Sequence, residues 1–204
     1  SRDLLLLDVI PLSLGIETVG GAFAKLVTRN STVPCRATEM FSTSVDNQTS
    51  IEVNVFQGER ELVKDCRELG RFKLRGLPAM PAGLPRVEVT FRVDADGVLT
   101  VTAKEQRSGV EASIDVVPSH GLTREQVKGI IKESILNAQA DFKARDLVEM
   151  RNKAHNLVQG TRRVLAMPEM PFTPEQRAEL VRDIARLEEL QRGEDVAALK
   201  RAAD

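Results

Sequence analysis

Hydrophobic and polar residues alternate with a period of two along much of the first 117 positions. In residues 86–93, Val and Phe alternate with Arg, Glu and Thr, and residues 10–16 and 51–55 repeat the pattern. Such alternation turns one face of a strand toward a core and the other toward water. Asp96-Gly97 between two such runs predicts a hairpin turn. We expect about eight short strands between residues 9 and 117, forming an antiparallel β-sandwich.

The periodicity becomes helical after Pro118. Thr123 and Gln126 have the spacing of a capping box, in which each residue's side chain bonds the other's backbone N–H at a helix start. Apolar residues then recur every three or four positions as far as Leu165. An unbroken helix of this length would far exceed the mean of about 11–12 residues. We therefore expect a break or bend near Ser134.

A second helical stretch follows the loop at residues 167–171. Thr173 precedes Pro174, which is the order typical of a helix cap and first turn. Gly193 is expected to end this helix, and a short helix is expected to begin near Asp195. The chain is thus predicted to be α+β, with strands and helices in two segregated blocks.

The composition excludes some classes of function. Lys and Arg total 29 against 30 Asp and Glu, so no broad positive field would attract nucleic acid or an anionic membrane surface. Aromatic residues make up only 3%, which leaves few surfaces for stacking bases. No apolar run reaches the ~18–20 residues of a membrane span. Two cysteines, Cys35 and Cys66, favour a reducing compartment, and we expect the cytoplasm.

Motifs of catalysis are absent from the sequence. It contains no phosphate-binding glycine loop, HExxH, CxxC or GxSxG pattern. Arg67 would lower the pKa of the neighbouring Cys66 thiol, but no base accompanies it. Asp94 and Asp96 are interpreted as turn residues rather than a catalytic pair. We predict that the chain is not an enzyme and holds no metal.

Several separate segments, in order along the chain, resemble the DnaK-type chaperones of the seventy-kilodalton heat-shock protein family. They are Asp3 to Thr18, Asn30 to Pro34, Phe41 to Thr43, Asp46 to Gln48, Val55 to Arg60 and Val93 to Gly97. The resemblance implies the peptide-binding half of such a chaperone. Residues 1–8 would be an interdomain linker, residues 9–118 a peptide-binding β-sandwich, and residues 119–204 a helical lid truncated at its C-terminus.

The resemblance also implies parts outside this chain. Leu4, Leu5, Leu6 and Leu7 would link to an N-terminal ATPase domain, which is absent here and would hold ATP and Mg²⁺ and control peptide affinity. The fragment itself would carry no cofactor. The implied partners are extended hydrophobic peptides and unfolded proteins, that ATPase domain, and a J-domain co-chaperone.

The resemblance places a substrate groove in the sandwich. Taken singly, each apolar residue of the groove is interpreted as core. Together they would form a pocket for one large aliphatic side chain, while backbone groups and one amide side chain would bond the peptide main chain. The implied substrate-binding residues are Ile16, Thr18, Val19, Phe41, Ser42, Ser44, Gln48, Ser50, Ile51, Glu52, Val53 and Val87.

The charge pairs that latch the lid in DnaK are mostly missing. Ala82, His155 and Gln159 occupy the corresponding positions, and only Asp46 remains of that set. We expect a weaker latch, or one that depends on protonated His155 near Asp46.

The type of chaperone stays open at this point. Residues 58–63, 65–67, 74–76, 81–83 and 109–114 look more like HscA, a specialist for iron–sulfur cluster assembly. Ser44 and residues 46–48 are closer to the generalist. A β-sandwich interaction domain without a peptide groove is the remaining alternative to a chaperone module.

Overall fold

The computed structural model describes residues 9–204, so the expected linker Leu4 to Leu7 lies outside the described residues. The chain divides into two compact units, residues 1–138 and 139–204, and each is described by itself. The first unit includes the helix that begins after Thr123, which the sequence-based division assigns to the lid.

The first unit contains two four-stranded antiparallel sheets, with strand orders β2-β1-β4-β5 and β3-β6-β7-β8. The number of strands in residues 9–117 and their antiparallel pairing confirm the sequence-based prediction. The short 3-10 helix η2 (Val63–Asp65) lies between β4 and β5. The strands are β1 (Leu14–Thr18), β2 (Ala22–Val27), β3 (Cys35–Phe41), β4 (Ser50–Gln57), β5 (Arg67–Arg75), β6 (Val87–Val93), β7 (Leu99–Glu105) and β8 (Glu111–Val116).

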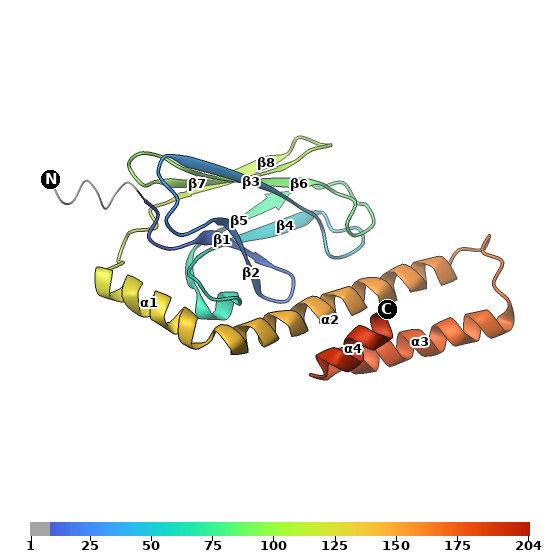
Figure 1. Cartoon of the computed structure of the whole chain (residues 1–204). Coiled ribbons are helices and arrows are strands. Elements are labelled where there is room, and N and C mark those ends of the chain that lie inside the picture. Colours follow the sequence, from blue (N-terminus) through green and yellow to red (C-terminus); the bar gives the residue numbers. More distant parts are fainter. Residues whose placement is uncertain (1–8) are drawn as a thin grey trace. The chain divides into compact units, whose positions relative to one another are not determined.

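The two sheets lie one against the other as two layers (Figure 1). Buried residues of both sheets form one hydrophobic core. Every second residue of β6, from Val87 to Val93, is at most 3% exposed, as its alternation predicts. Leu14 of β1 and Val55 of β4 enter the same cluster from the other sheet. Asp94 shapes the β6–β7 turn, because its Oδ1 accepts the backbone N–H of Asp96 at 2.9 Å and of Val98 at 3.0 Å.

Gly15 lets β1 and β2 approach closely. A β-carbon at this position would overlap the carbonyl oxygen of Ala24 and lie 2.8 Å from Cε2 of Phe23. The pairing register shifts between Leu14 and Gly15. Such a shift is a β-bulge, which increases the local twist of a strand. The β1–β2 hairpin therefore has its observed shape only because residue 15 lacks a side chain.

Helix α1 (Arg124–Leu136) begins with the predicted capping box of Thr123 and Gln126. Its C-cap is Asn137, so the break predicted near Ser134 lies three residues beyond that residue. Ser134 is helical, and its hydroxyl donates to the carbonyl of Ile131 at 2.6 Å. Asn137 adopts φ −101° and ψ 6°, outside the helical region, and α2 (Ala138–Leu165) follows at once.

The second unit consists of α2, α3 (Pro174–Arg192) and α4 (Val196–Ala203). Thr173 caps α3, Gly193 ends it and Asp195 caps α4, all as predicted. Its core comprises Ala154, Val158, Ile184, Leu187 and Leu199. No helix within residues 9–204 is long and apolar enough to cross a membrane.

Candidate functional site

Strands β1 and β4 pair over a short distance and then separate. Their pairing runs from Leu14 opposite Gln57 to Ile16 opposite Val55. Beyond this point β1 continues to pair with β2, and β4 continues to pair with β5. Two strand edges therefore face each other without main-chain hydrogen bonds between them. Unpaired edges of this kind can accept another extended chain.

A cavity of about 250 Å³ lies where the strands separate. Every sequence-predicted substrate-binding residue except Ser50 lines it. Glu17, Asn54 and Val89, which the sequence analysis missed, complete its lining. The lining residues are Ile16, Glu17, Thr18, Val19, Phe41, Ser42, Ser44, Gln48, Ile51, Glu52, Val53, Asn54, Val87 and Val89.

The floor of the cavity is apolar and comes from both sheets. Ile16 and Val53 belong to one sheet and Val87 to the other, and all three are at most 5% exposed. Phe41, which pairs with Val87, and Ile51 are half-buried. Because these side chains are also part of the packed core, the floor is pre-formed. It can accept one aliphatic side chain, for which apolar contact is the favourable term.

The Gln48 side chain joins two parts of the rim. Its Oε1 accepts the backbone N–H of Ser44 at 3.2 Å, and its Nε2 donates to the carbonyl of Ser50 at 2.8 Å. All three residues are expected from the resemblance to bond a peptide. In this conformation they bond one another, so the Ser44 N–H, which has a single proton to donate, would have to change its partner to serve a ligand.

The outer rim is more open. Val19, one of the two expected arch residues, is 54% exposed, while Ser44 is half-buried. The Ser42 hydroxyl donates to the carbonyl of Pro85 at 2.5 Å and so ties the end of β3 to the segment before β6.

The expected lid latch joins residues of different units. Asp46 Oδ1 accepts the backbone N–H of Ala82 at 2.8 Å, which holds two loops of the first unit together. His155 lies in α2, in the second unit. The latch stays a prediction.

Glu17 and Asn54 meet at the point where β1 and β4 separate. Asn54 Nδ2 donates to Glu17 Oε2 at 2.9 Å, so a side-chain bond takes the place of the next main-chain pair. The alternation along each strand puts these residues on the face opposite their buried neighbours. Their pairing depends on the register of β1 against β4, which the sequence does not state.

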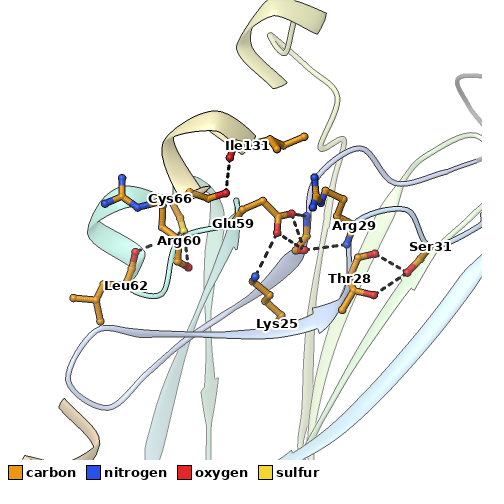
Figure 2. A network of polar contacts seen from close by, with 11 residues as sticks. Lys25, Thr28, Arg29, Ser31, Glu59, Arg60, Leu62, Cys66 and Ile131 are labelled. Atoms are coloured by element: carbon orange, nitrogen blue, oxygen red, sulfur yellow. Dashed lines mark hydrogen bonds and ion pairs between the residues drawn. The ribbon is translucent and has the colours of Figure 1, made fainter. Parts of the chain in front are cut away.

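A largely buried carboxylate, with 9% of its side chain exposed, fixes the other end of β1. Glu59 accepts the backbone N–H of Ser13 at 2.7 Å and pairs with Lys25 Nζ at 3.3 Å. The Ser13 hydroxyl also donates to Glu59 and accepts the backbone N–H of Arg29 at 2.9 Å. Figure 2 shows Lys25, Arg29 and Glu59 converging. These bonds fix the start of β1, the strand β2 and the end of β4 relative to one another. They thereby position β1, which forms one wall of the cavity.

The two cysteines are poor nucleophiles in this setting. Burial raises the pKa of the Cys66 thiol from 9.0 to about 11, which corrects the expectation that Arg67 lowers it. Cys66 packs against a cluster that contains Phe23 and Phe56. Burial also raises the pKa of Cys35, which packs against the main core. Both thiols remain protonated at neutral pH.

Comparison with known proteins identifies the family. The family model described as Hsp70 protein matches residues 1–204. A "Chaperone protein HscA homolog" of Variovorax paradoxus is 50% identical over 98% of this chain and 32% of its own length. "Chaperone protein HscA" of Escherichia coli is 47% identical over the same shares. A homolog of Cupriavidus metallidurans is 48% identical over 100% of this chain and 33% of its own length. The chain thus spans about a third of the length of these curated relatives.

The match corrects two expectations, that the chain is not an enzyme and that ATP and Mg²⁺ belong to an absent domain. The Hsp70 family model matches residues 1–204 as a whole. ATP and Mg²⁺ are therefore not assigned to a domain outside this chain. Among residues 9–204, no three His, Cys, Asp or Glu side chains lie together as metal ligands.

The strength and extent of these matches go beyond a shared motif. The family model covers the chain from end to end, and the relatives named above are all chaperones of one kind. The chain belongs to the Hsp70 protein family of chaperones.

Proposed function

We propose that the chain binds short, extended segments of unfolded or client proteins in the cavity between β1 and β4. The observation that carries the proposal is a cavity with an apolar floor at a place where two strand edges face each other unpaired. An extended segment would offer main-chain groups to those edges and one aliphatic side chain to the floor. This combination suits ligands of many sequences, because every peptide has the same main chain.

The size of the cavity supports one side chain rather than a whole small molecule. Its volume of about 250 Å³ lies below the roughly 300–1,000 Å³ typical of pockets for drug-sized ligands. Full burial of a Leu or Ile side chain contributes about 1.5–3 kcal/mol. The remaining affinity would come from main-chain hydrogen bonds along the strand edges.

We propose further that the chain is of the HscA type, a specialist for an iron–sulfur cluster assembly scaffold protein. The relatives named HscA, 47–50% identical over nearly the whole chain, support this choice over the generalist. On the same reading, the helices after Thr123 act as a lid, a J-domain co-chaperone is a partner, and the protein works in the cytoplasm.

Fluorescence anisotropy with two labelled peptides tests this function. One peptide is Leu-rich with basic flanks, and the other contains Leu-Pro-Pro, as HscA substrates do. We expect dissociation constants in the micromolar range, equivalent to about −8 kcal/mol, with preference for the Leu-Pro-Pro peptide. Equal affinity for both would favour the generalist. No binding to either, by protein shown to be folded, would favour an interaction domain without a peptide groove.

A further inference from the structure

The connection between β8 and α1 is bonded to an arginine of β5. Arg67 Nη1 donates to the carbonyl of Pro118 at 3.4 Å, and its Nη2 donates to the carbonyl of His120. The carbonyls of Val117 and Ser119, which alternate with these, accept backbone N–H groups of the connection itself. Four successive carbonyls are thus used in turn by local turns and by Arg67, so the path of the connection depends on both sets of bonds.

The same arginine is bonded to the sheet that carries the cavity. Arg67 Nη1 donates to Gln57 Oε1 at 3.3 Å. Gln57 is 1% exposed and stands at the end of β4, where it pairs with Leu14 of β1 on one side and with Arg67 on the other. Because β1 and β4 form the walls of the cavity, Arg67 joins these walls, through one buried amide, to the segment that leads into α1.

These contacts require the shape of an arginine side chain. The three acceptors are amide and carbonyl oxygens rather than carboxylates, so the positive charge strengthens bonds to neutral groups. A guanidinium holds its five N–H groups in a rigid planar fork and can reach separated acceptors at once. A lysine amine is a compact charge on a flexible stem and cannot reproduce this arrangement.

Helix α1 depends on its attachment at the N-terminal end, because its own packing is sparse. None of its 13 residues is buried. Ile135 and Leu136, near its end, are 70% and 73% exposed. Packing of an apolar face supplies most of the stability of a helix in a protein. In α1 this contribution is small, so the bonds that fix the preceding connection count for more.

We propose that Arg67 anchors the connection and α1 to the cavity sheet, and that release of this anchor lets the helices after Thr123 move and speeds the exchange of bound peptide. This inference rests on the proposed peptide-binding function and names a positioning residue that regulates it. Arg67 does not line the cavity. It should therefore change how often the cavity is accessible rather than how well the peptide fits.

Arg67→Met tests the anchor, because methionine removes the hydrogen bonds and keeps an unbranched side chain. Stopped-flow anisotropy with the labelled Leu-rich peptide should show association and dissociation both about three- to tenfold faster, since both rates scale with the accessible fraction. The dissociation constant should change by less than about threefold. A merely destabilised protein would bind less peptide without associating faster. Both rates within twofold of wild type, in protein shown by thermal unfolding to be folded, would overturn the proposal.

Two further variants separate the fork from its charge and from general surface effects. Arg67→Lys keeps the charge but loses the fork, so exchange should still be faster than in the wild type. Wild-type rates in this variant would overturn the role of the fork. Arg92→Met is the matched control, because it removes an exposed arginine from the outer face of β6. It should leave both rates unchanged, and faster exchange there would contradict a specific role for Arg67.

Backbone amide hydrogen exchange measures the anchor without any peptide. Residues 117–127 should exchange several-fold faster in Arg67→Met than in the wild type, while β6 keeps its protection. Unchanged exchange in residues 117–127 would overturn the anchor whether or not a peptide binds. Failure of the proposed function looks different. In that case the wild-type protein would bind neither labelled peptide, while exchange in residues 117–127 would still depend on Arg67.

Discussion

Replacing Ile51 with phenylalanine is expected to weaken the binding of a Leu-rich peptide by about tenfold or more. Ile51 is half-buried and lines the cavity floor, so a larger ring at this position would occupy space meant for the ligand. A Leu side chain excluded from the floor would lose about 1.5–3 kcal/mol of burial, which corresponds to roughly 10- to 150-fold in affinity. Anisotropy titration of the variant measures this loss directly.

Ile51→Val is the matched control for this change. It shortens the side chain by one methyl group, enlarges the cavity and leaves it open, so peptide affinity should change by less than about fivefold. Both variants should unfold at nearly the wild-type temperature, because Ile51 is only partly buried. Unaltered affinity in a folded Ile51→Phe protein would place peptide binding outside this cavity.

Replacing Gly15 with alanine is expected to destabilise the first unit by about 3 kcal/mol. The new β-carbon would overlap the carbonyl oxygen of Ala24, and this oxygen belongs to the backbone of β2. Neither strand can move freely, because Ile16 and Val27 are buried in the core on either side. Equilibrium denaturation with urea, followed by circular dichroism, measures the loss. The displaced β1 wall should also weaken peptide binding.

Gly129→Ala is the matched control for the same chemical change. Gly129 lies inside α1, and a β-carbon added there would meet no atom within 4 Å beyond the adjoining backbone of its own helix. Alanine should favour the helix by about 0.5–1 kcal/mol. Equal stability of the Gly15→Ala and wild-type proteins would show that β1 and β2 are not held as closely as described.

Local patterns in the sequence predicted most of the fold. Alternation located the strands, as in β6, because burial on one face of a strand leaves a period of two. Thr123, Thr173 and Asp195 located helix starts, because a cap bonds backbone groups only a few residues away. The helix break expected near Ser134 lies at Asn137, three residues further on, and the Ser134 hydroxyl bonds a carbonyl of its own helix.

The candidate site was predictable only in part. The resemblance supplied most of the cavity lining, but which bonds form in it depends on register and loop conformation. The bonds of Gln48 to Ser44 and Ser50 follow from the path of one loop. The meeting of Glu17 with Asn54 follows from the point at which β1 leaves β4. The raised pKa of Cys66 follows from burial beside Phe23 and Phe56, which are distant in sequence.

The central claim is that extended peptides bind in the cavity between β1 and β4. The most direct test is titration of the isotopically labelled protein with the Leu-rich peptide, followed by backbone amide NMR. We predict that the largest shift changes fall together on cavity residues of both sheets, such as Ile16, Phe41 and Ile51. Changes confined to the outer face of β6 and β7, around Thr90 and Thr102, or to the second unit, would contradict the account.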